Sequence, residues 1–253
     1  MNARILTALA GVPLVVICLV VSVWTTLALA GLVISLAAFE LLRMMQSATP
    51  YRLAALIAII WVCLTLPFLL PDPALVLVWL VAGFAALINH QMNGLPRWWA
   101  SSAGYLGLLA MPIMALRLMP DFMTWLTILF VGTWLTDTMA LFGGRYFGRR
   151  QLSPISPRKT WEGTIIGIIF GGLGIFLSGW LTEALTSTPL VVILASILLP
   201  PLAVLGDLFE SAIKRHYNHK DSGRLLPGHG GLLDRVDSLL FTIPALWLLV
   251  LLF

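Results

Sequence analysis

Long apolar runs fill most of this sequence and constrain its fold more than any other feature. About nine of them reach roughly 17 residues, the length needed to cross a bilayer as a helix. They cover residues 5–23, 26–42, 52–70, 74–89, 101–119, 122–142, 163–181, 189–206 and 238–253. Hydrophobic residues make up 60% of the chain and charged residues 10%, and a soluble globule with so few charges has no way to cover its own surface. The sequence therefore predicts an all-α, polytopic integral membrane protein.

The basic residues are distributed unevenly among the loops. If the N-terminus is cytoplasmic, every Lys and Arg except Arg117 falls at a cytoplasmic position. An excess of Lys and Arg is the mark of cytoplasmic loops. The pattern therefore predicts a cytoplasmic N-terminus and an external C-terminus. Orientation in the membrane also accounts for the net charge of +4, so this charge does not indicate a nucleic-acid partner.

Charge also separates the chain into two halves. Residues 1–120 carry few charged side chains and are interpreted as N-terminal scaffold helices. Residues 121–253 hold two polar cytoplasmic loops and are expected to carry the chemistry. The sequence has no low-complexity linker between the halves, which favours a single continuous membrane domain. Within the scaffold, Glu40 and Arg43 lie three residues apart, a spacing typical of a local helix pair.

The first polar loop follows a carboxylate that lies inside an apolar run. Asp137 precedes the polar sequence at Gly143 by about one and a half helical turns. Intramembrane carboxylates usually face a polar cavity, an ion or a basic partner. Asp137 is therefore predicted to belong to a functional site, and a structural salt bridge is the alternative.

The same loop ends in a motif with hydroxyl and basic residues. Ser156 and Thr160 can cap the next helix, Pro157 can occupy its first turn, and Lys159 lies beside them. A helix N-terminus with hydroxyls and cations nearby favours a phosphate group. The alternative is an ordinary cap surrounded by the basic residues that orientation requires.

The second polar loop begins on a polar helix face. Asp207, Glu210, Ser211 and Lys214 follow the spacing i, i+3, i+4, i+7 and share one side of a helix. A metal held by the carboxylates could share an anionic ligand with Lys214 and Arg215. The alternative is a solvated helix end with internal ion pairs.

Two further carboxylates open the last apolar run. Asp234 and Asp237 lie three residues apart, and together with Asp207 and Asp137 they stand at the inner ends of runs that could converge. Oxygen ligands without cysteine or paired histidine favour Mg²⁺ over zinc. His229, in a segment rich in glycine and proline, could act as a base or ligand, although a lone histidine more often makes loop hydrogen bonds.

These residues favour metal-assisted phosphoryl or nucleotidyl transfer. Carboxylates combined with Lys and Arg, and without a convincing protein nucleophile, suit a reaction in which one substrate attacks another. Because the polar residues gather at the inner membrane surface, one substrate is expected to be a lipid phosphate and the other a soluble nucleotide.

The second polar loop resembles a known family. Ser211, Lys214-Arg215, Lys220-Asp221, Gly223 and the segment from Leu226 to Asp237 match the signature of the phosphatidate cytidylyltransferases, also called CDP-diacylglycerol synthases. The resemblance extends to Gly206-Asp207-Leu208, Ser156-Pro157, Lys159-Thr160-Trp161 and Asp137-Thr138. In the first half, only the hydropathy is similar.

The resemblance implies an enzyme that condenses CTP with phosphatidate to give CDP-diacylglycerol and pyrophosphate. It further implies a homodimer in the bacterial inner membrane, with the active site facing the cytoplasm, and with Mg²⁺ and K⁺ as metals. The implied metal ligands are Asp207, Asp234, Asp237 and Asp137. The implied nucleotide or phosphate contacts are Ser156, Lys159, Thr160, Arg215, Asp221 and His229, and the implied catalytic residues are Asp207, Asp234, Asp237, Lys214 and Lys220.

Two other functions fit parts of the same pattern. A CTP-dependent kinase of a polyprenol or similar lipid alcohol would use the same nucleotide and metal but would transfer the γ-phosphoryl group. An ion-coupled transporter would also have intramembrane carboxylates, but these should lie near the midplane of the bilayer rather than at the inner ends of the spans.

Overall fold

The structure is a computed structural model that describes residues 13–46, 48–70, 72–89, 106–107, 111–223, 225 and 230–253, with the backbone alone at 83–89. Six helices in these ranges are long and apolar enough to cross a membrane. They are Val23–Met44, Pro50–Leu69, Phe122–Phe147, Trp161–Leu181, Pro189–His216 and Leu233–Leu252, the last interrupted by a turn at Asp237 and Ser238. A shorter apolar stretch covers Pro73–Ala82. The predicted class, an all-α integral membrane protein, is confirmed.

Only part of the nine predicted spans can be compared with the structure, because two of the apolar runs are not fully described. The runs at 5–23 and 101–119 lie partly outside these ranges, and their described portions are helical at 13–21 and 111–117. The remaining runs coincide with helices, and most of these helices extend beyond the apolar residues. For example, the helix Pro189–His216 continues past residue 206 through the polar face at its end.

The chain forms two compact units, the first consisting of residues 1–119 and 216–236. Its helices are α2 (Val23–Met44), α3 (Pro50–Leu69), α4 (Pro73–Asn89) and the short α10 (Leu233–Val236). The N-terminus of α2 is fixed by Ser22 and Thr25, whose side chains each accept a hydrogen bond from the other's backbone N–H. Gly31 lets α3 come close, because a Cβ there would lie 2.5 Å from the Trp61 ring. The segment 216–236, which contains most of the signature, therefore folds with the N-terminal helices.

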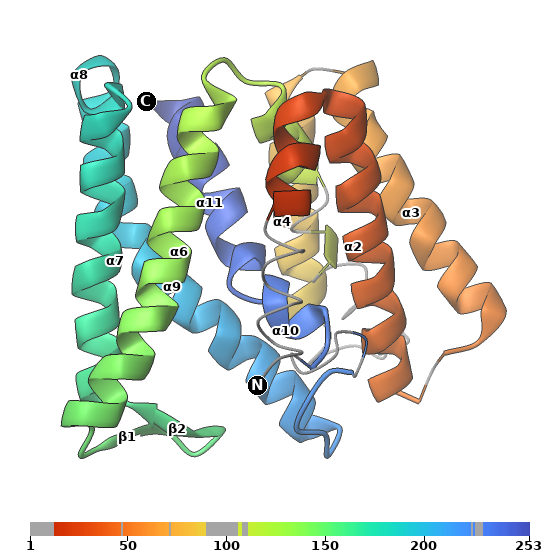
Figure 1. The fold of residues 1–253 in the computed structure, drawn as a ribbon. Coiled ribbons are helices and arrows are strands. Elements are labelled where there is room, and N and C mark those ends of the chain that lie inside the picture. The colour runs from red at the N-terminus through yellow and green to blue at the C-terminus, as the bar shows by residue number, and fades with distance from the viewer. Residues whose placement is uncertain are drawn as a thin grey trace. The chain divides into compact units, whose positions relative to one another are not determined.

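The second unit consists of residues 120–215 and 237–253. Its helices are α6 (Phe122–Phe147), α7 (Trp161–Leu181), the short α8 (Ala184–Ser187), α9 (Pro189–His216) and α11 (Leu239–Leu252). Helices α6 and α7 run side by side (Figure 1). Their backbones approach closely because α7 carries small residues on this face: a Cβ at Gly163 or Gly167 would lie 2.6 Å from a carbonyl oxygen of α6.

A two-stranded hairpin joins α6 to α7 and was not predicted. Strands β1 (Gln151–Ser153) and β2 (Ser156–Thr160) pair antiparallel, with an irregularity between Gln151 and Ser153. The expected helix start is therefore wrong for Ser156 and Pro157, which lie in β2. The cap is Thr160, whose hydroxyl accepts a hydrogen bond from Gly163 N at 3.2 Å. Figure 1 shows the hairpin at the adjoining ends of α6 and α7.

Candidate functional site

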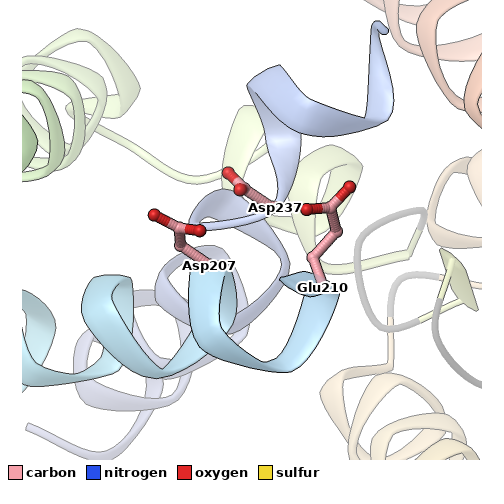
Figure 2. A group of neighbouring side chains, drawn as sticks. All are labelled: Asp207, Glu210 and Asp237. Carbon is pink, nitrogen blue, oxygen red and sulfur yellow. The ribbon is translucent and has the colours of Figure 1, made fainter. Parts of the chain in front are cut away.

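Three carboxylates of the second unit come together where α9 meets the start of α11. Asp207 and Glu210 project from one face of α9, and Asp237 lies just before α11 (Figure 2). One oxygen from each lies within 4.8 Å of the other two. Glu210 has no exposed surface and Asp237 is 9% exposed, whereas Asp207 is partly accessible. This carboxylate cluster confirms the prediction that Asp207 and Asp237 converge.

A glycine makes this convergence possible. A Cβ on Gly206 would lie 2.6 Å from the carbonyl oxygen of Asp237 and 3.0 Å from the Cα of Ser238. Backbone at that distance leaves no room for a side chain. Gly206 therefore lets α9 approach the start of α11 closely enough for Asp207 and Asp237 to share one site.

Each end of the cluster is paired with a lysine. Lys159, from the end of β2, forms an ion pair with Asp207, and Lys214 forms one with Glu210 one turn along α9. Ser211 also donates a hydrogen bond to Asp207 Oδ1 at 3.3 Å. The predicted helix face is thus confirmed, and the pair of Glu210 with Lys214 agrees with the alternative interpretation of a face with internal ion pairs. The buried position and the third carboxylate, Asp237, distinguish it from a solvated helix end.

The hairpin that presents Lys159 is held by Glu162. One carboxylate oxygen of Glu162 accepts hydrogen bonds from the backbone N–H groups of Arg149 and Arg150, at 3.0 and 3.2 Å. The N–H of Trp161 in turn donates to the carbonyl oxygen of Arg150 at 2.9 Å. The start of α7 and the start of the hairpin are therefore fixed to each other, and this fixes where β2 delivers Lys159.

Three further predicted residues of this unit do not belong to the cluster. Arg215 is exposed and donates through Nε to the carbonyl oxygen of Ile155, in the hairpin turn, at 3.4 Å. Ser156 is half-buried at the start of β2. Asp137 is exposed on α6 and is not one of the three clustered carboxylates.

The signature residues of the first unit form a second polar arrangement. Asp234, in α10, accepts hydrogen bonds through Oδ2 from Gly231 N at 2.9 Å and from Ser222 N at 3.2 Å. Two distant parts of the signature are therefore held on one carboxylate. Lys220 and Asp221 are exposed immediately before this arrangement, and His229 lies outside the described residues.

Three glutamates make contacts in the structure that their sequence pattern did not predict. Glu210 belongs to the predicted polar face but was not among the expected ligands. Glu162 stood beside the phosphate-type motif, yet no pattern linked it to the amides of Arg149 and Arg150. Glu40 was paired with Arg43, which is wrong: within the described residues Glu40 is buried, Arg43 is exposed, and no ion pair joins them.

The carboxylate cluster suits a small, hard cation. Carboxylate oxygens are ligands that Mg²⁺ accepts, and an ion about 2.1 Å from each ligand would hold the oxygens at most about 4.2 Å apart. The observed limit of 4.8 Å is close to this spacing. Three carboxylates and two paired lysines also leave one negative charge in excess when all are ionised. The arrangement can therefore hold a divalent cation, with Lys159 and Lys214 beside it to contact an anionic substrate.

The fold and the site define an integral membrane protein with a buried cluster of carboxylates and lysines. The sequence model of the Cytidylyltransferase family matches residues 2–253. The chain therefore belongs to the Cytidylyltransferase family.

Relatives match different shares of this chain, and two of the three described next cover most of it. A protein from Brucella abortus biovar 1 (strain 9-941) named phosphatidate cytidylyltransferase is 39% identical over 194 residues, which cover 74% of this chain and 70% of that protein. A protein of the same name from Bacillus subtilis (strain 168) is 36% identical over 236 residues, covering 87% and 86%. Phosphatidate cytidylyltransferase 4, chloroplastic, of Arabidopsis thaliana is 49% identical over 118 residues, covering 46% of this chain and 29% of that protein.

Proposed function

We propose that this chain catalyses the phosphatidate cytidylyltransferase reaction, in which CTP and phosphatidate give CDP-diacylglycerol and pyrophosphate. Membership of the family and the names of its relatives support this activity. The observation that carries the chemistry is the carboxylate cluster of Asp207, Glu210 and Asp237 with Lys159 and Lys214 at its ends. A nucleoside triphosphate that reacts with a lipid phosphate brings together many negative charges. A cation held by the carboxylates, together with the two lysines, would neutralise part of this charge.

We assign the three carboxylates to a Mg²⁺ site. When bound there, the cation would draw charge from the α-phosphate and from the departing pyrophosphate. Asp237, which also accepts a hydrogen bond from its neighbour Ser238 N at 2.7 Å, is held in place for this role. The roles of Asp137 and Asp234 as additional ligands, and of K⁺ as a second metal, stay predictions from the sequence.

The lysines provide the second part of the mechanism. Lys159 and Lys214 each pair with one carboxylate in this structure. We assign them to phosphate oxygens when the substrates are bound. With Lys159 and Lys214 contacting the phosphate oxygens, the phosphatidate oxygen attacks the α-phosphorus in line, the bond from the α-phosphorus to the oxygen of the β-phosphate breaks, and pyrophosphate leaves. No covalent bond to the protein is formed.

Other polar residues are assigned to substrate binding. Ser156, Thr160 and Arg215 lie on or beside the hairpin and are proposed to contact nucleotide or phosphate. Lys220, Asp221 and His229 have the same proposed role from their positions in the signature.

The arrangement in the membrane follows the charge pattern. We propose nine spans with a cytoplasmic N-terminus, so that the hairpin and the signature face the cytoplasm, where CTP is available. The proposed location is the bacterial inner membrane, from which phosphatidate enters sideways, and the proposed assembly is a homodimer. The scaffold and catalytic halves, 1–120 and 121–253, are proposed to act as one membrane domain.

The test is product analysis with purified protein. CTP, phosphatidate and Mg²⁺ should give pyrophosphate and a lipid whose mass is that of CDP-diacylglycerol. A folded protein that binds CTP but yields no such lipid would refute the assignment of phosphatidate as acceptor. In that case a polyprenol or similar lipid alcohol is the acceptor to examine next.

A further inference from the structure

A buried carboxylate of the N-terminal helices contacts the signature directly. Glu40, near the end of α2, is 2% exposed. Its Oε2 accepts a hydrogen bond from the Ser222 hydroxyl at 3.1 Å and another from Leu233 N at 2.9 Å. These donors lie 182 and 193 residues further along the chain. One carboxylate oxygen of α2 therefore joins the two ends of the signature's loop.

Two glycines enclose the same carboxylate. A Cβ on Gly223 would lie 2.7 Å from Glu40 Cδ, and a Cβ on Gly231 would lie 2.7 Å from Glu40 Oε2. Glu40 fills this space at Gly223, and at Gly231 Glu40 shares it with the Ser222 hydroxyl and the Gly223 backbone N. The glycines of the signature thus form a cradle that fits a carboxylate from another helix.

The cradle is continuous with the surroundings of Asp234. Ser222 donates its hydroxyl to Glu40 and its backbone N–H to Asp234. Leu233, which donates its N–H to Glu40, is the residue before Asp234 and is completely buried. Glu40 therefore holds the residues that orient the Asp234 carboxylate.

Burial makes this contact specific. A carboxylate removed from water is costly unless donors satisfy it, and a buried N–H that loses its acceptor is costly as well. Both donors reach the same oxygen, so a glutamine in place of Glu40 keeps an acceptor for both of them, whereas an alanine keeps none.

We propose that Glu40 is a positioning residue, which holds Ser222 and Leu233, and with them Asp234, in the geometry that the transfer reaction requires. The proposal rests on the proposed function for its catalytic part, because Asp234 is a predicted metal ligand. It assigns a role in the reaction to the N-terminal half, whose own sequence indicated only scaffold helices.

The experiment compares Glu40→Ala with Glu40→Gln, and uses Arg43→Ala as a control on an exposed position of the same helix. Hydrogen exchange of peptides covering residues 217–236 is measured first, without nucleotide or metal. We expect exchange in Glu40→Ala to be faster by about tenfold or more, and exchange in Glu40→Gln and Arg43→Ala to match the unmodified protein. Unchanged exchange in Glu40→Ala would overturn the proposal.

Turnover then tests the catalytic part. In Glu40→Ala we expect kcat to fall about 10- to 100-fold and the Mg²⁺ concentration for half-maximal rate to rise about tenfold. In Glu40→Gln both should stay within about threefold. Loss of folded protein alone would reduce kcat without moving the Mg²⁺ midpoint, so an unchanged midpoint in Glu40→Ala would reduce Glu40 to a structural role and contradict the proposal.

A second variant protects the test against misfolding. If Glu40→Ala is not recovered as folded protein, Ser222→Ala removes the hydroxyl donor alone and should shift exchange and the Mg²⁺ midpoint in the same direction by a smaller factor. No shift in Ser222→Ala would then overturn the proposal.

The two proposals can fail separately. If the unmodified protein does not convert CTP and phosphatidate although Glu40→Ala accelerates exchange, the proposed function fails while the anchoring by Glu40 stands.

Discussion

At the scale of single residues, the candidate site is built around the carboxylate of Asp237. This carboxylate is buried, and Asp207 and Glu210 each place a carboxylate oxygen within 4.8 Å of one of its oxygens. Three clustered carboxylates repel one another, so a cation or a lysine must compensate them. We therefore expect the replacement of a single carboxylate oxygen in the cluster to lower activity strongly.

Asp237→Asn should remove activity and leave the fold intact. The asparagine oxygen can still accept the hydrogen bond from Ser238 N, but the negative charge that would bind Mg²⁺ is lost. We expect the rate of CDP-diacylglycerol formation to fall about 100-fold or more, with an unchanged melting temperature in detergent. Glu183→Gln, at an exposed position before α8, is the matched control and should keep the normal rate. A normal rate in Asp237→Asn would exclude the residue from the cation site.

Sequence periodicity predicted some of these residues and could not predict others. Asp207 and Lys214 share a helix face because 3.6 residues make a turn, so their alignment could be predicted locally. Glu40 and Ser222 are 182 residues apart, and only the folded chain brings them into contact. No repeat or spacing in the sequence predicts this hydrogen bond, because it is a tertiary contact.

At the scale of secondary structure, the apolar runs predicted the helices well and the hairpin not at all. Residues 156–160 do not alternate between apolar and polar side chains, the pattern that indicates a strand. Their pairing is instead supported from outside by Glu162, which holds the amides of Arg149 and Arg150. Helix α9 is a second case, because its polar final turns belong to the helix although the apolar run ends earlier.

Gly206→Ala should separate the two elements that carry the carboxylate cluster. The added Cβ would meet backbone of Asp237 and Ser238, which cannot yield as a flexible side chain could. Alanine raises intrinsic helix stability by about 1 kcal/mol, so the variant should still fold. We expect at least a tenfold lower rate and a higher Mg²⁺ requirement.

Gly174→Ala is the control for this substitution. Its Cβ would meet the far end of the Leu135 side chain, which can move. Its rate and Mg²⁺ requirement should stay near normal. Equal effects of the two substitutions would show that α9 need not approach Asp237 closely for activity.

Glu162 should determine how well the hairpin presents Lys159. Glu162→Ala leaves the amides of Arg149 and Arg150 without their acceptor, whereas Glu162→Gln keeps an oxygen for them. We expect the KM for CTP to rise about 10-fold in the alanine variant and to change little in the glutamine variant. The measurement is initial rate against CTP concentration at saturating phosphatidate, and equal KM values in all three proteins would contradict this role.

At the scale of the whole molecule, the connections at the two ends of α7 differ in charge: Arg and Lys lie before this helix, and Glu183 follows it. The hairpin precedes α7 and the short helix α8 follows it, so these two features lie at opposite ends of one candidate span. The predicted orientation puts the hairpin in the cytoplasm and α8 outside. The charge pattern predicted this orientation because loops rich in Lys and Arg resist translocation. The charge of a loop can be counted in the sequence without knowing the fold.

Cysteine labelling of intact cells tests this orientation. After replacement of the native Cys18 and Cys63, Ser187→Cys in α8 should react with a membrane-impermeant maleimide in intact cells. Gln151→Cys in β1 should react only after the membrane is permeabilised, and both residues are exposed. Labelling of Gln151→Cys in intact cells would invert the proposed topology.

The fate of the individual phosphorus atoms of CTP tests the central claim most directly. Purified protein is given phosphatidate, Mg²⁺ and CTP that carries a radioactive label at either the α- or the γ-phosphorus, and the label in the extracted lipid is counted. Cytidylyl transfer predicts label in the lipid from α-labelled CTP and none from γ-labelled CTP. Lipid labelled from the γ-phosphorus alone would contradict the account and identify a CTP-dependent lipid kinase.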